Sequence, residues 1–156
     1  MIMLGEVDCG FVIWVRSKRY NITVDEQINE SICNLFNFIQ KKIINSNKYK
    51  PRDIIIAGSI LPTLAPPNTD KNLLGGARRE VDVSQKIRTI KTIEYNNILK
   101  MKCNEHGYQY IDVTNFILDK KENVVKSIFL NKNPHDHHLD NEKTYKLWIS
   151  QLDTIL

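Results

Sequence analysis

The residues best suited to chemistry lie near the C-terminus, in an eight-residue segment with the sequence NPHDHHLD at positions 133–140. The segment holds three of the four histidines and two carboxylates: His135, Asp136, His137, His138 and Asp140. A histidine oriented by a carboxylate is the general-base half of a hydrolase triad. The same side chains are metal ligands, so a metal-dependent hydrolase built on residues 135–140 is an alternative. A third interpretation is a helix start capped by Asp140, with the histidines in solvent.

A metal site is the weaker of the two chemical interpretations. The adjacent residues His137 and His138 are expected to project in different directions, and the segment has neither an HxxxH nor an HxH frame with a distal ligand. We therefore expect no bound metal and no other cofactor.

A second segment of interest, GEVDCG at positions 5–10, follows the apolar residues 1–4. A turn of this composition can place backbone amides and the carboxylates of Glu6 and Asp8 at the end of a sheet, although an ordinary strand-to-loop turn has the same composition. Ser59 follows another apolar run but lacks the Gly-x-Ser-x-Gly pattern of a nucleophile, so we interpret it as structural or as lining the site. The GxGxxG and GxxxxGKS/T patterns are absent, which argues against a nucleotide-phosphate site.

Apolar runs predict three strands, at residues 1–4, 53–58 and 108–112. A further run, 11–15, is interpreted as an edge strand or a segment crossing the end of the sheet. The loop 61–76 contains three prolines and two glycines, and loops of that length are usually functional.

Helices are predicted between the strands and at the C-terminus. Thr23 and Glu26 form a capping box, and behind them apolar residues recur at helical spacing: Ile28, Ile32, Leu35, Phe36, Ile39 and Ile43. A second helix, from residue 80 to about 103, is expected to bury Val83, Ile87, Ile90, Ile98 and Met101. A last helix, capped by Asp140, is expected to bury Tyr145, Trp148, Leu152 and Ile155.

This alternation of elements predicts a single α/β domain over residues 1–156, with a parallel sheet and helices on both faces. Ligands of such sheets bind at the carboxyl ends of the strands. The segments 5–10, 61–76 and 133–140 are therefore expected to converge on one edge of the sheet.

Composition argues against several classes of function. The chain has 156 residues, of which 42% are hydrophobic and 26% charged, as in ordinary globular domains. Its net charge of +4 comes from scattered residues without a basic stripe interleaved with aromatics, so we expect no nucleic-acid partner. The longest apolar run, 11–15, is too short for a bilayer span, so we expect no membrane association. Cys9, Cys33 and Cys103 form no disulfide or zinc pattern and indicate small apolar core residues in a cytoplasmic protein.

Taken in order, four segments resemble the SGNH or GDSL-like hydrolase superfamily of esterases and acylhydrolases. GEVD at 5–8 is similar to the family's Gly-x-Asn-Asp block, and residues 54–62 are similar to the core strand that runs into a proline. Tyr95 and Asn96 match a Tyr/Phe-Asn pair on a helix. DHHL at 136–139 resembles the block that carries the catalytic Asp and His. The resemblance covers the C-terminal part of the family's domain.

The resemblance implies a three-layer α/β/α fold with a parallel, flavodoxin-like sheet, truncated at its N-terminus. It implies an ester hydrolase acting on carbohydrate or lipid esters, in which His138 is the base and Asp136 orients it. The residues implied on the substrate and oxyanion side are Gly5, Glu6, Asp8, Ser59 and His137. Of these, His137 also competes with His138 for the role of base.

The chain departs from the family's pattern at three points. The Gly-Asp-Ser-type block with the nucleophilic serine is absent, so the hydrolase is expected to be inactive or incomplete. Val7 stands where the family has an Asn, and an apolar side chain cannot donate a hydrogen bond to an oxyanion. Asp136 precedes His138 by two residues, where the family usually has three.

These departures leave a non-catalytic binding module on the same fold as an alternative function. The expected partners are a small-molecule ester, if the protein is active, and a macromolecule covering the edge of the first strand. That macromolecule is a second copy of the chain or a missing N-terminal half.

Overall fold

The computed structural model describes residues 1–63, 79–133 and 136–156. Its strands and α-helices are β1 (Ile2–Met3), α1 (Ile13–Tyr20), α2 (Val24–Phe38), β2 (Ile55–Ala57), α3 (Gln85–His106), β3 (Gln109–Ile111), α4 (Thr114–Ile117), β4 (Leu118–Asp119), β5 (Val124–Val125) and α5 (Asn141–Leu152). Shorter helical turns are η1 (Asp8–Val12), η2 (Ile39–Ile43), η3 (Ile44–Ser46), η4 (Pro51–Asp53) and η7 (Ser127–Phe129).

The three predicted strands form one parallel sheet in the order β1-β2-β3. Ile56 at the centre of β2 pairs with Ile2 on one side and with Tyr110 on the other. The prediction of three neighbouring parallel strands is confirmed, although each strand is shorter than expected. A separate antiparallel hairpin of β4 and β5, which the sequence analysis did not predict, follows α4.

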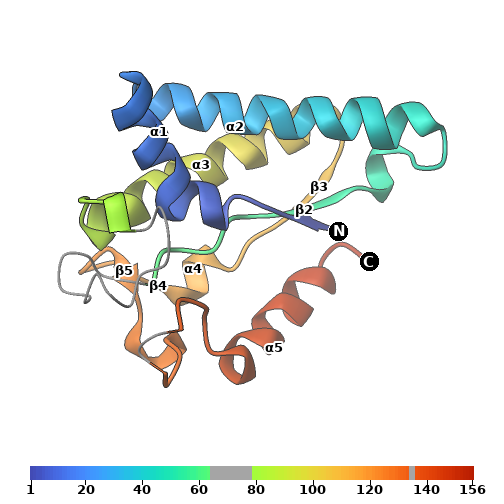
Figure 1. Ribbon diagram of the computed structural model, residues 1–156. Coiled ribbons are helices and arrows are strands. Elements are labelled where there is room, and N and C mark those ends of the chain that lie inside the picture. The colour runs from blue at the N-terminus through green and yellow to red at the C-terminus, as the bar shows by residue number, and fades with distance from the viewer. Residues whose placement is uncertain (64–78, 134–135) are drawn as a thin grey trace.

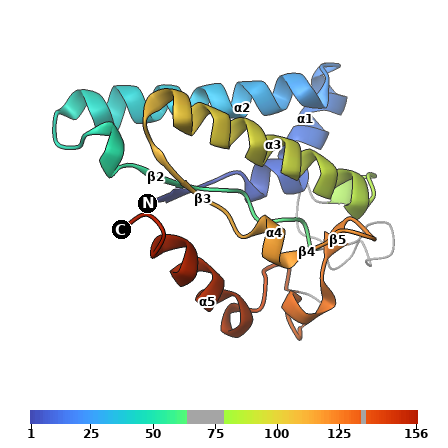
Figure 2. The ribbon, with the colours of Figure 1, turned by 180° about the vertical axis from the view of Figure 1, so that it is seen from behind.

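Helices lie on both sides of this sheet. Figure 1 and Figure 2 show α2 and α3 on one side and α5 on the other. The start of α2 has the predicted capping box, since the Glu26 N–H donates to Thr23 Oγ1 at 3.1 Å and the Thr23 N–H donates to Glu26 Oε2 at 2.7 Å. The mixed α/β class predicted from the alternation of elements is therefore correct.

Two apolar clusters hold these elements together. The larger one joins α2 to the sheet and to α3, and its buried members include Ile28, Ile32, Leu35, Phe36, Ile39, Ile54, Ile56, Tyr95 and Leu99. The smaller one lies beyond the carboxyl end of β3, with Leu61, Val113, Ile117, Leu118, Val125 and Leu139 buried in it. Trp148 of α5 packs against the smaller cluster. Because Leu139 follows His138 directly, its burial anchors the histidine segment to this cluster.

The buried face of α3 differs from the predicted one. Ile87, Ile90 and Met101 are exposed, whereas the buried positions are Arg88, Thr89, Thr92, Tyr95, Asn96, Leu99 and Cys103. Ile98 does pack partly against the larger cluster, and α3 begins at Gln85 rather than at residue 80. The spacing of the isoleucines therefore located the helix approximately but did not give its orientation. Polar residues can take core positions where their hydrogen bonds are made inside the protein, as with Thr92 Oγ1, which donates to the carbonyl of Arg88 at 2.8 Å.

Residues 11–15 are helical, so their interpretation as a strand or crossing segment is wrong. They belong to η1 and α1, with Ile13 and Val15 turned into the protein. The indole N–H of Trp14 donates to the carbonyl of Cys9 at 2.9 Å. A short apolar run does not by itself distinguish a strand from a buried helical segment.

The C-terminal helix begins as predicted, but of the residues expected to be buried Trp148, Leu152 and Ile155 are only partly buried. Asp140 caps α5 by accepting from the Glu142 N–H at 3.0 Å. Tyr145 is exposed, and the buried residue of the first turn is Thr144, whose hydroxyl donates to the Asp140 carbonyl at 2.8 Å. None of the helices in the described segments combines the length and the apolar character of a bilayer span.

Candidate functional site

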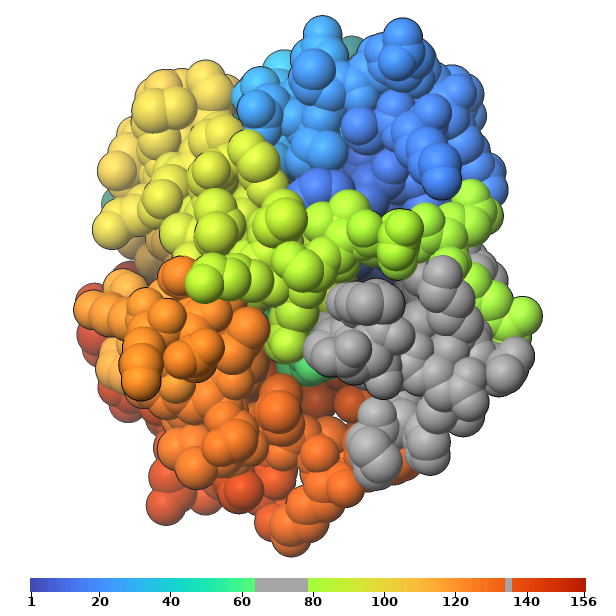
Figure 3. All heavy atoms as spheres, turned by 90° about the vertical axis from the view of Figure 1, so that its left-hand side faces the viewer, coloured from blue at the N-terminus to red at the C-terminus, as the bar shows by residue number. Residues whose placement is uncertain are grey.

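The turn after β1 and the loop before α5 meet at the carboxyl end of the sheet. Figure 3 views this end of the molecule, where N-terminal residues in blue, the segment entering α3 in yellow-green and C-terminal segments in orange share one face. The loop before α5 is held there by the bridge between Leu130 and Leu139 and by the Asp140 N–H, which donates to the Phe129 carbonyl at 2.9 Å. Of the predicted loop 61–76, only residues 61–63 are described, and His135 also lies outside the described residues.

Asp136 and His138 form a hydrogen-bonded pair. The ring Nδ1 of His138 lies 2.7 Å from Asp136 Oδ1, and the backbone N–H of His138 donates to the same oxygen at 2.9 Å. Asn131 Nδ2 donates to the other carboxylate oxygen at 2.9 Å. The N–H of His138 and then its ring lower the pKa of the Asp136 carboxyl below its ordinary value. A two-residue spacing is therefore sufficient for the pair, because the carboxylate folds back onto the following backbone.

His137 lies beside His138 rather than pointing away from it. The two ring centroids are 4.0 Å apart with the planes inclined at 37°, so the prediction of different directions is wrong. The chain bends at His138, and this bend breaks the alternation that an extended segment would have. The carbonyl of His137 accepts a hydrogen bond from Thr63 Oγ1, which links the histidine segment to the chain after β2.

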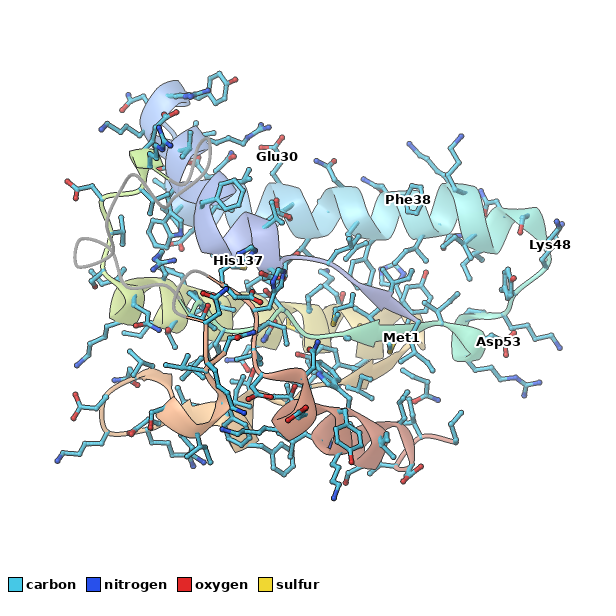
Figure 4. The ribbon with its side chains drawn as sticks, turned by 60° about the horizontal axis from the view of Figure 1, so that its bottom comes forward. Met1, Glu30, Phe38, Lys48, Asp53 and His137 are labelled. Atoms are coloured by element: carbon cyan, nitrogen blue, oxygen red, sulfur yellow. The ribbon has the colours of Figure 1, made fainter. Side chains whose placement is uncertain are left out.

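Glu6 is the residue of the first turn that reaches the histidines. Its Oε1 lies 3.9 Å from Nε2 of His137. His137 is labelled in Figure 4. The side chains of Glu6 and His137 are 39% and 27% exposed, so both are accessible but neither is fully solvated. The prediction that the histidine segment faces the turn after β1 is confirmed for this residue.

Gly5 fixes the course of the chain into that turn. Its φ of +106° belongs to a region that side-chain-bearing residues rarely adopt, and an added Cβ would lie 2.8 Å from Tyr95 Cε1. The Gly5 carbonyl then accepts from the Cys9 N–H at 2.8 Å and so begins the helical segment. The backbone conformation of Gly5 thus sets the direction of the chain at Glu6, whose side chain lies beside His137.

Asp8 makes its contacts on the other side of the turn. Ser31 Oγ donates to Asp8 Oδ2 at 2.7 Å, and both residues line a cavity of about 280 Å³ that also includes Leu4, Phe38 and Tyr95. Its lining residues come from the first turn, α1, α2 and α3. The two carboxylates predicted for the site therefore lie in different places. Glu6 contacts His137, and Asp8 contacts α2.

Ser59 is part of the interior. It is 1% exposed, and its backbone is held by Asn96, which accepts from the Ser59 N–H at 2.7 Å and donates to the Ser59 carbonyl at 2.9 Å. The Ser59 hydroxyl contacts the carbonyl of Ile60 at 3.4 Å. These contacts agree with the structural interpretation of Ser59.

Two buried groups near the turn are electrostatically perturbed. Desolvation lowers the pKa of Arg88 to about 10, while its Nη1 donates to the Gly10 carbonyl at 3.2 Å. Desolvation also raises the pKa of the Cys9 thiol to about 12, so this cysteine is no nucleophile at neutral pH.

Three further side chains support the pair and its loop, and no motif in the sequence marks them. Asn131, Thr63 and Arg88 each contact a segment of the site through a side chain. The tertiary fold brings Thr63 and Arg88 to the site, whereas Asn131 is close to Asp136 in sequence. Asn96 was noted as part of a matching pair, but its hydrogen bonds to Ser59 could not be read from the sequence.

Comparison of the chain with protein-family models, curated proteins and solved structures finds no match.

Proposed function

We propose that this chain carries the acid–base half of an SGNH-like ester hydrolase on a three-layer α/β/α fold. The observation that supports it best is the contact of 2.7 Å between His138 Nδ1 and Asp136 Oδ1. Its position at the carboxyl end of a parallel sheet, where α/β proteins bind ligands, is a second support. The resemblance in sequence suggests carbohydrate or lipid esters as the substrate class.

The proposed chemistry follows from the direction of the hydrogen bond between His138 and Asp136. An ionised carboxylate only accepts hydrogen bonds, so Nδ1 of His138 must donate and Nε2 then carries the basic lone pair. Nε2 takes the proton of an attacking hydroxyl group, while Asp136 orients the ring and stabilises the imidazolium that forms. The proton later passes to the leaving alkoxide as the ester bond breaks.

The attacking hydroxyl group is the missing component. Within residues 1–63, 79–133 and 136–156, no hydroxyl is hydrogen-bonded to the ring of His138. In this proposal the nucleophile comes from outside these residues, from a second polypeptide, or from a small alcohol that reaches the site.

An alcohol-acceptor assay tests the base without needing the missing serine. The rate of cleavage of a short-chain aryl ester is measured with increasing concentrations of a simple alcohol. A rate that rises with alcohol concentration is expected for the parent chain, and it should disappear in His138→Ala. Asp136→Asn should lower it at least about tenfold, because general-base catalysis depends on the tautomer and orientation of the ring.

His106→Ala is the matched control, because His106 lies on α3 before β3, at the opposite end of the sheet. The residue is exposed, with its ring beside those of Phe36 and Tyr108, and it reports background imidazole catalysis. Equal rates for His138→Ala and His106→Ala would refute the base and favour a non-catalytic binding module.

A further inference from the structure

We infer that Glu6, His137 and His138 form a binding site for a divalent transition-metal ion such as Zn²⁺. One ligand atom from each residue can be chosen so that all three lie within 4.8 Å of one another. Two segments separated by more than a hundred residues supply them, so the fold, and not local sequence, creates the cluster. This site is distinct from a metal cluster confined to residues 135–140.

The distances are close to those of a metal centre. A tetrahedral ion with ligands near 2.1 Å places neighbouring ligand atoms about 3.4 Å apart. Glu6 Oε1 and His137 Nε2 are already 3.9 Å apart. The side chains of Glu6, His137 and His138 are 39%, 27% and 59% exposed, so they have the freedom to close the remaining gap. Their exposure also leaves the ion accessible to a water molecule or a substrate.

Contacts behind the ligands match those of metal-binding histidines. A histidine ligand commonly donates its second ring N–H to a carboxylate, which fixes its tautomer and orientation. Asp136 makes this contact with Nδ1 of His138, which leaves Nε2 as the nitrogen to bind the ion. Asn131 fixes Asp136 in turn, and Thr63 holds the carbonyl of His137.

The donor set indicates which ions bind. Two imidazoles and one carboxylate suit zinc and its neighbours in the first transition series, whereas Mg²⁺ and Ca²⁺ prefer oxygen ligands alone. Three protein ligands leave a fourth position open, which is the arrangement of catalytic zinc sites. An ion on Nε2 of His138 also competes with the proton that this atom accepts in the proposed hydrolysis, so metal and base functions exclude each other.

Direct zinc binding tests the inference independently of any hydrolytic activity. The purified chain is stripped of metal and titrated with Zn²⁺ in the presence of a chromophoric chelator. One equivalent is expected to bind, and Glu6→Gln, His137→Gln and His138→Gln should each weaken binding at least about a hundredfold. Asp136→Asn should weaken it by about 10- to 100-fold, as expected when a ligand's supporting carboxylate is lost.

His106→Gln is the control and should bind zinc like the parent chain. Circular dichroism of each variant checks that it is folded, and Co²⁺ absorption of the parent chain reports four-coordinate geometry without any substitution. Unchanged zinc affinity in Glu6→Gln would overturn the inference. Loss of binding in His135→Gln, with Glu6→Gln unaffected, would also overturn it by placing the ion on residues 135–140.

Discussion

Asn96 shows how a single buried side chain shapes the carboxyl end of β2. Its amide oxygen and nitrogen satisfy both backbone groups of Ser59, and the nitrogen also lies 3.2 Å from Thr114 Oγ1. Ser59 lies beyond the last residue of β2, where no strand satisfies its N–H and carbonyl. Asn96 therefore makes the hydrogen bonds that a neighbouring strand would make, and it links the end of β2 to α3 and α4.

Replacing Asn96 by Ala should lower the free energy of unfolding by about 2–4 kcal/mol, since it leaves a buried N–H and a buried carbonyl without partners. Urea denaturation measures the change. Asn97→Ala, at the next position of α3 and exposed, is the control and should change stability by less than about 1 kcal/mol. Similar losses in the two variants would contradict the role assigned to Asn96.

The cysteines differ in burial, and this difference predicts a pH dependence. Burial raises the pKa of Cys9 to about 12, whereas the thiol of an unfolded chain ionises near its ordinary value of about 8.5. The stability linked to Cys9 is therefore complete below that ordinary value and is lost as the pH rises toward 12. The loss amounts to about 1.4 kcal/mol per pH unit.

Cys9→Ala should show a shallower alkaline decline of the unfolding free energy than the parent chain. Cys33→Ala should not, because Cys33 is exposed, contrary to the prediction that all three cysteines are core residues. Alkylation followed by mass spectrometry provides a second measurement: iodoacetamide should modify Cys33 in the folded protein and reach Cys9 only after denaturation. Rapid modification of Cys9 under native conditions would contradict its burial.

At the scale of elements, the sequence predicted most where local signals agree with tertiary packing. A capping box and a continuous apolar face both mark α2, and both are present in the structure. On α3 the apolar period is misleading, because the core side of the helix carries Arg88, Thr92 and Asn96. Each of these polar residues forms hydrogen bonds with protein atoms. Thr92 bonds within the helix, whereas the partners of Arg88 and Asn96, Gly10 and Ser59, are distant in sequence. The hydrophobic pattern alone therefore could not orient the helix.

The same distinction applies to the candidate site. The resemblance to the family implied the pairing of Asp136 with His138, although their two-residue spacing departs from the family's usual three; the local backbone turn makes the contact possible. Glu6 was expected near the histidines only as one of several residues of its turn, since parallel strands bring their carboxyl ends together. Glu6 and Asp8 face different partners because of the backbone conformation at Gly5. The spacing of residues in the sequence does not predict that conformation.

The turn between β1 and η1 can be tested with two glycines. Gly5→Ala should destabilise the protein by about 1–3 kcal/mol, because a side chain is strained at its positive φ and would overlap Tyr95. It should also weaken zinc binding by displacing Glu6. Gly10→Ala is the matched control, since an added Cβ there has nothing within 4 Å, and alanine favours the helical turn. A more stable Gly5→Ala variant, measured by thermal unfolding, would contradict the geometry of the turn.

On the scale of the whole molecule, β1 forms one edge of the sheet in the part of the chain that the structure describes, and apolar side chains in and beside β1 are exposed. Met1, Met3, Leu4 and Val7 are each at least 50% exposed, as is Phe38 on α2. Met1 and Phe38 are labelled in Figure 4. An edge strand with exposed apolar neighbours is a surface on which another chain can pair. A second copy related by a two-fold axis would place its own β1 antiparallel to this one.

We therefore predict a homodimer that forms with increasing concentration, measured by light scattering from dilute solution up to the solubility limit. Met3→Lys should shift the equilibrium toward the monomer, because a charged side chain on an edge strand opposes edge-to-edge pairing. Ile128→Lys makes the same substitution at an exposed apolar residue of η7 and should leave the equilibrium unchanged. A parent chain that stays monomeric at every concentration would refute the dimer, and equal effects of the two lysines would show that copies associate through another surface.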